Sequence, residues 1–356
     1  MSAWAPPCVD RLHGVLAHLR LKPKAPRSRM RDLFRASLQL CYNGAMASRS
    51  SAPYLVLTVG VFVVSTASIL IRYAQGEGVP SLTIAAMRLG IAALILTPIV
   101  CLRSSRELLA LRVRDLLLAL LAGAFLAAHF WSWIASLAYT SVASSTALVT
   151  TNPLWVGLAS VLILGERMGR ATIAGIVLTL AGSVLIFASD SSAQQAAMQP
   201  DPLLGNLLAL LGAAMASGYL LVGRALRKRV GLLAYIWLAY GSAALLLLFA
   251  VGASGSTLSG YSTVAYAAML GLALGPQLLG HTSFNWALRH LSATFVALSI
   301  LGEPVGSALL ALMIFDERLA PVQLAGFVLL LVGIYLAARG ERGVPADRLQ
   351  SERGAG

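Results

Sequence analysis

The sequence predicts an all-α integral membrane protein of about ten transmembrane helices, built as two inverted five-helix repeats. The prediction rests on the composition, the uneven placement of basic residues and an internal repeat. The chain is 58% hydrophobic and only 12% charged, whereas soluble proteins carry about 25% charged residues. One bilayer crossing takes about 20 predominantly apolar residues of helix, and the chain contains many stretches of that kind.

These apolar stretches are separated by short polar segments, and most are long enough to cross a bilayer. The expected spans are residues 54–72, 81–101, 115–135, 142–164, 171–188, 203–223, 232–251, 263–287, 292–315 and 320–338.

The basic residues favour this set of spans, because lysine and arginine collect on the cytoplasmic side of membrane proteins. With the N-terminus inside, all of the 27 basic residues except Arg72, Arg88 and Arg318 fall in the cytoplasmic tails and loops. One span more or fewer would destroy this asymmetry, so we expect both termini in the cytoplasm. The net charge of +13 does not indicate nucleic acid as a partner, since no basic face is interleaved with aromatic residues.

The first 53 residues are basic, and we expect a cytoplasmic tail without a transport role. An amphipathic helix on the membrane surface and a translation start at Met46 are alternatives that stay open. The expected organisation is a tail at 1–53, a first five-helix repeat at 54–188, an external linker at 189–202, a second repeat at 203–338 and a cytoplasmic tail at 339–356. The three cysteines lie far apart, so no disulfide framework or metal site is expected, and no cofactor either.

An internal match relates the two halves of the chain at an offset of 151 to 152 residues. The matched pairs include Pro153 with Pro304, Glu166 with Glu317, Gly182 with Gly333, Ser65 with Ser217 and Arg72 with Arg224. Because each copy has an odd number of spans, the second copy enters the membrane from the opposite side. Inverted repeats with a central site are typical of secondary transporters, so the repeat predicts alternating access.

Over residues 54–338 the chain resembles the drug/metabolite transporter superfamily, EamA type. The motifs that carry the resemblance are Asn152-Pro153 followed by Gly165-Glu166-Arg167, Glu303-Pro304 followed by Asp316-Glu317-Arg318, a glycine-bearing helix after each, and Arg88-Leu89. The resemblance implies a transporter in a cell membrane, in the first place a bacterial inner membrane. It implies movement of amino acids, sugars or other small metabolites without an ATPase partner. The basic N-terminal extension departs from the compact family pattern.

Glu303 is the one carboxylate near the middle of an expected span. A charge at that depth costs at least about 2.5 kcal/mol, and burial favours the neutral form of a carboxyl group. We expect Glu303 to bind substrate or couple transport to protons; the alternative is a structural glutamate bonded to backbone groups that Pro304 frees. Arg88 is expected either to bind a substrate carboxylate or phosphate or to pair with Glu303.

Gln277, His281 and Asn285 recur every four residues and therefore share one helix face. Pro276, just before them, can open the helix and leave backbone groups for a ligand. We expect this face to line a cavity, although polar stripes also join helices to one another. The further candidates for cavity lining are Ser299 on the ninth span, Asn152 on the fourth and His129 on the third.

Four aromatic residues are expected to have mainly structural roles. Trp131 and Trp133 are expected as anchors at the outer membrane interface, and Tyr219 and Tyr240 as core residues with a weaker claim to ligand contact.

The leading hypothesis is a secondary transporter that exports a small metabolite, with the proton as the candidate coupling ion. Its partners are the small-molecule substrate and the lipid bilayer, and a homodimer stays open. The alternative is a membrane-embedded enzyme acting on a lipid or small molecule, which the single mid-span carboxylate does not favour. An ATP-driven pump is excluded within this chain, because it has no GxxxxGK[ST] loop.

Overall fold

A computed structural model describes residues 52–152, 154–156, 158–159, 169–190, 199–227, 229–287 and 299–340. The chain divides into two units, Met1–Pro53 and Tyr54–Gly356, and the helical bundle described below is the second. Within the described residues the secondary structure is entirely helical, as the sequence predicts.

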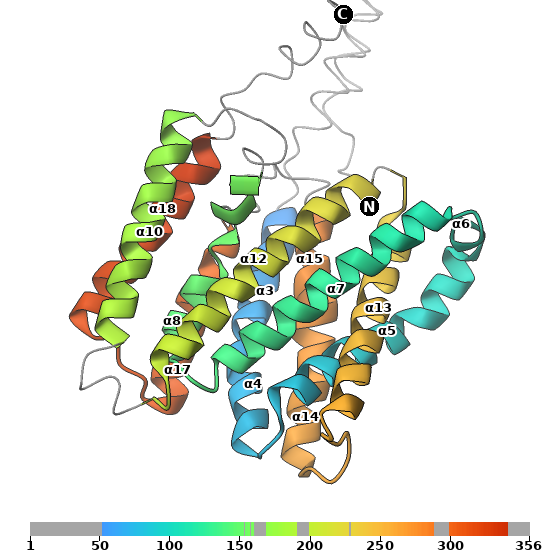
Figure 1. Ribbon diagram of the computed structural model, residues 1–356, viewed down its shortest axis with the longest axis horizontal. Helices are drawn as coiled ribbons and strands as arrows, with labels where there is room; N and C mark the ends of the chain where they lie inside the picture. Colours follow the sequence, from blue (N-terminus) through green and yellow to red (C-terminus); the bar gives the residue numbers. More distant parts are fainter. Residues whose placement is uncertain are drawn as a thin grey trace, which may run out of the picture. The chain divides into compact units, whose positions relative to one another are not determined.

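The helices follow the apolar stretches of the sequence (Figure 1). They are α3 (Ala52–Ser65), α4 (Ala67–Gly76), α5 (Ser81–Arg103), α6 (Ser105–Leu109), α7 (Val113–Ser136), α8 (Val142–Val149), α10 (Arg170–Asp190), α12 (Pro202–Leu226), α13 (Leu232–Ala253), α14 (Thr263–Leu272), the π-helix η1 (Ala273–Gly280), α15 (His281–Ala287), α17 (Gly302–Phe315) and α18 (Pro321–Gly340).

Among the described residues, 7 helical stretches are long and apolar enough to cross a membrane, and two shorter apolar helices, Gly302–Phe315 and Pro321–Leu336, accompany them. The expected fourth span, 142–164, is described only in part: α8 ends at Val149, and residues 160–168 lie outside the description. The expected ninth span is likewise described only from residue 299 onward.

Large apolar side chains cover the outside of the bundle. Leu94 is 73% exposed, Phe249 79% and Met313 81%. Single exposed apolar residues are common on soluble proteins, but an apolar surface of this extent is not. The side chains therefore suit a lipid environment, which accounts for the high apolar fraction of the sequence.

Two of the expected spans are interrupted. The first span breaks at Thr66 between α3 and α4, where the Thr66 hydroxyl donates to the carbonyl of Val63 at 2.6 Å. The eighth span changes from α14 into the π-helix η1, which contains Pro276. Proline lacks a backbone N–H and disturbs the i→i−4 ladder, and π-helical turns often mark functional positions. The structure thus has an irregular helix at Pro276, in the form of a π-helix; that its backbone groups bind a ligand stays a prediction.

The last helices of the two copies, α10 and α18, pack side by side at one edge of the bundle (Figure 1). Their contact is made at glycines: a Cβ on Gly182 would lie 2.6 Å from the carbonyl oxygen of Gly326, and one on Gly333 2.5 Å from the amide of Thr179. Small residues of this kind let helices approach closely in a membrane. Gly182 and Gly333, which the internal repeat matches, therefore both lie in the contact between these two helices.

The two copies run in opposite directions where they meet. Thr140 forms hydrogen bonds with Arg72, near the end of α4, and with Asn206, near the start of α12. We call this side of the bundle the Glu317 end, and the opposite side, where Tyr54 lies in the first turn of α3, the Tyr54 end.

Candidate functional site

Arg88 is the central residue of the site, and it is completely buried in α5. Ala85 and Ala92, on the same helix face, are also fully buried and leave room for the guanidinium. Its Nε donates to the amide oxygen of Gln277 at 2.8 Å. The guanidinium carbon lies 4.1 Å from the ring centre of Phe130, a distance at which a cation is attracted by an aromatic face.

Arg88 does not pair with Glu303. The ion pairs within 4 Å that the described residues form are Arg72–Glu317, Arg229–Asp115 and Arg318–Asp316. Glu303 acts on Arg88 electrostatically from a greater distance. Of the two alternatives drawn from the sequence, direct pairing with Glu303 is therefore absent from this conformation.

Glu303 lies in the first turn of α17 and is half-buried. Its backbone carbonyl accepts from the hydroxyl of Ser65 at 3.3 Å, and Ser307 donates back to the carbonyl of Ser65 at 3.0 Å. These bonds tie α17 to the break between α3 and α4. Pro304 is buried in the same turn.

Gln277 and His281 both lie at the centre of the bundle. Gln277 is buried within η1 and orients Arg88. His281 begins α15, with its ring 6.3 Å from that of Phe130, edge to face. The side chain of Asn285, the third residue of this expected face, lies outside the described part of the chain.

His129 and Trp133 form an aromatic wall on α7. His129 Nδ1 lies 2.8 Å from the carbonyl oxygen of Gly212 on α12, and its ring stacks on Trp133 with centres 6.1 Å apart. Trp133 is only 3% exposed, so its expected role as an interface anchor is wrong. Trp131, on the other face of the helix, is 42% exposed and suits that role.

The cluster is built from both copies of the repeat. The offset of 152 residues that relates Ser65 to Ser217 also relates Arg88 to Tyr240 and His129 to His281. Tyr240 is buried and interacts with both Gln277 and Arg88. The site therefore lies where the two copies face each other, which is the position of the substrate site in repeat-built transporters.

Asn152 corresponds to Glu303 in the repeat, and both have the same type of contact. The hydroxyl of Ser217 donates to the carbonyl of Asn152 at 3.1 Å, just as Ser65 donates to Glu303. With its amide turned, the Asn152 nitrogen also donates to Val149 and Ala213. In each copy the first helix thus bonds to the fourth helix of the other copy. Only one of the two equivalent positions carries a charge.

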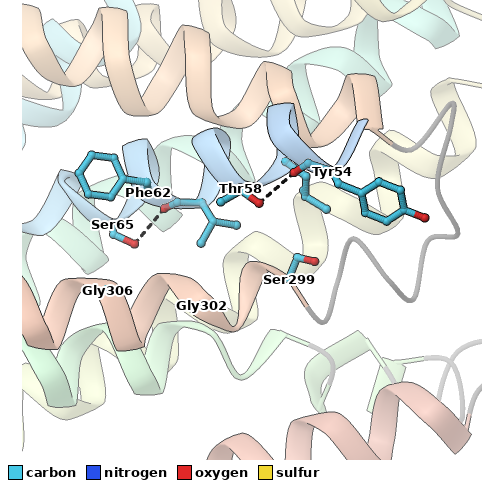
Figure 2. Close-up of a pocket in the computed structure, with 9 residues that line it drawn as sticks. Tyr54, Thr58, Phe62, Ser65, Ser299, Gly302 and Gly306 are labelled. Atoms are coloured by element: carbon cyan, nitrogen blue, oxygen red, sulfur yellow. Dashed lines mark hydrogen bonds between the residues drawn. The ribbon is translucent and has the colours of Figure 1, made fainter. Parts of the chain in front are cut away.

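A pocket of about 330 Å³ lies between α3 and α17, and neither Arg88 nor Gln277 is among the residues that line it. In Figure 2, Tyr54, Thr58 and Phe62 lie on α3, across from the α17 side. The lining residues are Tyr54, Leu57, Thr58, Val61, Phe62, Ser65, Ser299, Gly302 and Gly306. The glycines Gly302 and Gly306 face Val61 and Ser65. Of the residues expected to line a cavity, Ser299 is found in this pocket.

At the Glu317 end, α4, which continues the first span after α3, is joined to the chain that follows α17. Arg72 Nη2 donates to Glu317 Oε1 at 2.8 Å and to the carbonyl of Thr140 at 3.0 Å. The other carboxylate oxygen of Glu317 accepts from the backbone amide of Val142 at 2.9 Å, at the start of α8. Tyr73 and Phe315 pack beside this group with ring centres 5.6 Å apart. We call these residues the Glu317 latch.

A second polar group strengthens the Glu317 end. Asp190, at the end of α10, is 4% exposed. It accepts from Asn206 Nδ2 at 2.7 Å and from Gln323 Nε2 at 2.9 Å, and Gln323 also donates to Ser144 at 2.8 Å. This group joins α8, α10, α12 and α18. It did not stand out in the sequence, because Asp190 lies at a helix end like many surface carboxylates.

Two motif residues of the first copy, Pro153 and Glu166, lie outside the described part of the chain. Their counterparts Pro304 and Glu317 are placed as given above. Among the described residues no group of His, Cys, Asp and Glu side chains could hold a metal ion.

Comparison with known proteins identifies a family and solved structures of related fold. The model of the EamA-like transporter family matches residues 51–188 and 203–339. A solved structure titled "Crystal structure of protein" shares 19% identity at a TM-score of 0.56, covering 82% of this chain and 99% of its own. At that identity the likeness concerns the fold. No curated protein matches the chain.

Proposed function

Since this chain belongs to the EamA-like transporter family, whose members move small molecules across membranes, we propose that it carries a small metabolite by alternating access. The proposal includes ten spans in two inverted repeats, with both termini in the cytoplasm of a bacterial cell. It also keeps the domain boundaries expected from the sequence, with the repeats at 54–188 and 203–338.

One observation carries the proposal: the seam between the first span and α17 is hollow towards one end and latched at the other. The pocket runs from Tyr54 to the level of Ser65 and Gly306. Beyond Ser65, Arg72 and Glu317 join the same two segments. Alternating access requires a site between repeats that opens to one side at a time, and this arrangement fits the state that is open at the Tyr54 end.

The distribution of arginine supports the orientation of that state. Arg103, Arg106, Arg112 and Arg114 lie at the Tyr54 end, where α5 ends and α7 begins. Only Arg72 and Arg318 lie at the Glu317 end among the described residues. By the rule that basic residues face the cytoplasm, the pocket opens inward, and an exporter loads its substrate from that side.

Within the site, we assign substrate contact to Arg88, Gln277, His281 and His129, and proton coupling to Glu303. Glu303 is held next to the pocket by Ser65, on a helix that also forms the latch. A proton bound there changes the charge of the site and so the balance between its two open states. A carboxylate on the moving seam is well placed for that task.

The experiment is transport into vesicles reconstituted with the purified protein. Inside-out and right-side-out vesicles are each supplied with amino acids, sugars or nucleotides in the external solution, with and without a pH gradient. We expect one class to accumulate in a gradient-dependent manner and to exchange across the membrane. No movement of any class, by protein that is folded and inserted, would contradict the proposed function.

A further inference from the structure

We propose that Arg88 and Trp133 together form a binding subsite for an oxyanion, a carboxylate or phosphate group of the transported substrate. The inference rests on the proposed transport function and adds the chemical class of the ligand. It also gives a role to Trp133, which no motif in the sequence marks.

The first observation is that three hydrogen-bond donors in this cluster have no partner. Arg88 Nη1, Arg88 Nη2 and Trp133 Nε1 are buried and make no hydrogen bond to any described residue. Buried donors are nearly always paired in folded proteins, and a charged donor left unpaired is especially costly. Because the guanidinium carbon lies 5.8 Å from the Trp133 ring centre, one ligand group can reach both side chains.

The second observation is the type of group that is missing. All three unpaired atoms are donors, and neither guanidinium nor indole nitrogen can accept a hydrogen bond. The ligand must therefore supply acceptors. The planar guanidinium presents two parallel N–H groups, which match the two oxygens of a carboxylate or phosphate.

The third observation is the charge of the surroundings. The one hydrogen bond that Arg88 makes within the described chain goes to the neutral amide of Gln277. Glu303 acts on it only from beyond ion-pair distance. In a medium of low dielectric constant an unpaired cation attracts an anion strongly, so an anionic ligand is preferred over a neutral one of the same shape.

The local packing keeps the donors in place without a ligand. Phe130 covers one face of the guanidinium, Gln277 fixes Nε, and His129 stacks on Trp133. A group held in this manner loses little conformational freedom on binding. The sole competitor for Arg88 within the described cluster is the carboxylate of Glu303.

The test measures the thermal unfolding of the purified full-length protein in detergent with three benzene derivatives of similar size and different charge. Benzoate is an anion, benzamide is neutral and benzylamine is a cation; inorganic phosphate is tested separately at equal ionic strength. A ligand that binds the folded state raises the unfolding temperature. We expect benzoate or phosphate to raise it in a saturable manner, and benzamide and benzylamine not to. A saturable effect of benzoate alone assigns a carboxylate, and one of phosphate alone a phosphate.

The variants assign the effect to the two side chains. Trp133→Phe keeps the ring and removes the N–H, and should weaken anion binding at least threefold; Trp131→Phe, the matched control on the exposed face, should not change it. Arg88→Gln should abolish anion binding. Arg88→Lys keeps the positive charge but loses the paired N–H groups of the guanidinium, and should weaken anion binding; it serves as the test if Arg88→Gln does not fold. Glu303→Gln removes the competing carboxylate and should strengthen anion binding.

Three results would overturn the subsite. The first is equal stabilisation by benzoate and benzamide, and the second is no stabilisation by benzoate or phosphate. The third is unchanged anion binding both in a folded Arg88 variant (Arg88→Gln or Arg88→Lys) and in the single variant Trp133→Phe. Failure here is distinct from failure of the transport proposal. Vesicle transport of a neutral or cationic metabolite would refute the anionic substrate class and support the transport function. Anion binding without any transport would support the subsite and contradict the transport function.

Discussion

At the scale of single residues, the two copies of the repeat differ in a few charged side chains at the candidate site. Asn152 and Glu303 occupy equivalent positions and accept the same type of hydrogen bond from Ser217 and Ser65. Arg88 likewise corresponds to Tyr240. The backbone arrangement is therefore shared by both copies, while each charged residue of the proposed site occurs in one copy only.

The carboxylate of Glu303 gives the first prediction. Glu303→Gln keeps the shape and removes the titration, so the variant should insert normally, lose accumulation driven by a pH gradient, and keep substrate exchange. Gradient-driven uptake and exchange in vesicles measure the two properties separately. Glu77→Gln, at an exposed helix end, is the matched control. If Glu303→Gln retained pH-dependent accumulation like that of the wild type, Glu303 would not be the coupling group.

The sequence indicated candidate site residues only where a polar side chain interrupts an apolar stretch. Arg88, Glu303 and Gln277 stand out as polar groups in apolar stretches. Trp133 does not, because a buried aromatic and an interface anchor look alike on a helix without knowledge of its rotation. The partners Arg72 and Glu317 were individually visible, but their ion pair joins segments 245 positions apart.

At the scale of helices, the apolar stretches predicted the elements well and their interruptions poorly. The break at Thr66 and the π-helix around Pro276 both arise where other helices pack tightly. A Cβ on Gly280 would meet Val64, and one on Gly306 would meet Ser65. Proline signals an irregular helix, but its form depends on these tertiary contacts, which a local pattern does not contain.

The contact between α10 and α18 gives the second prediction. Gly182→Ala places a methyl group against the backbone of Gly326 and Leu330, and overpacking of this kind costs about 1–3 kcal/mol. The unfolding temperature in detergent should therefore fall by several degrees. Gly241→Ala, where a Cβ meets nothing within 4 Å, should leave it unchanged or raise it. An equal effect of the two variants would show that close packing at Gly182 does not stabilise the protein.

At the scale of the whole molecule, hydrogen bonds connect the two copies: the first helix of each copy bonds to the fourth helix of the other. The seam between the first span and α17 then has a hollow half and a latched half. The internal repeat predicted an alternating mechanism, but which end is closed could not be predicted, since a symmetric sequence pattern permits both states.

Orientation in the membrane gives the third prediction. In a variant without the three native cysteines, single cysteines at Asp201 and Ser254 should react with an impermeant maleimide added outside intact cells. Cysteines at Ser105 and Arg229 should react only after the membrane is opened. Labelling of position 105 or 229 from outside would refute the proposed orientation.

The Glu317 latch offers the most direct test of alternating access. Cysteines in place of Tyr73 and Phe315, whose rings are 5.6 Å apart, can be joined by a short bis-methanethiosulfonate. This reagent forms a disulfide with each thiol, releases methanesulfinate as the leaving group, and holds the Glu317 end closed until the disulfides are reduced. The account predicts that vesicle transport stops on cross-linking and returns on reduction, while each single-cysteine variant transports throughout. Full transport by the cross-linked protein would contradict the account, because substrate would then cross without the Glu317 end opening.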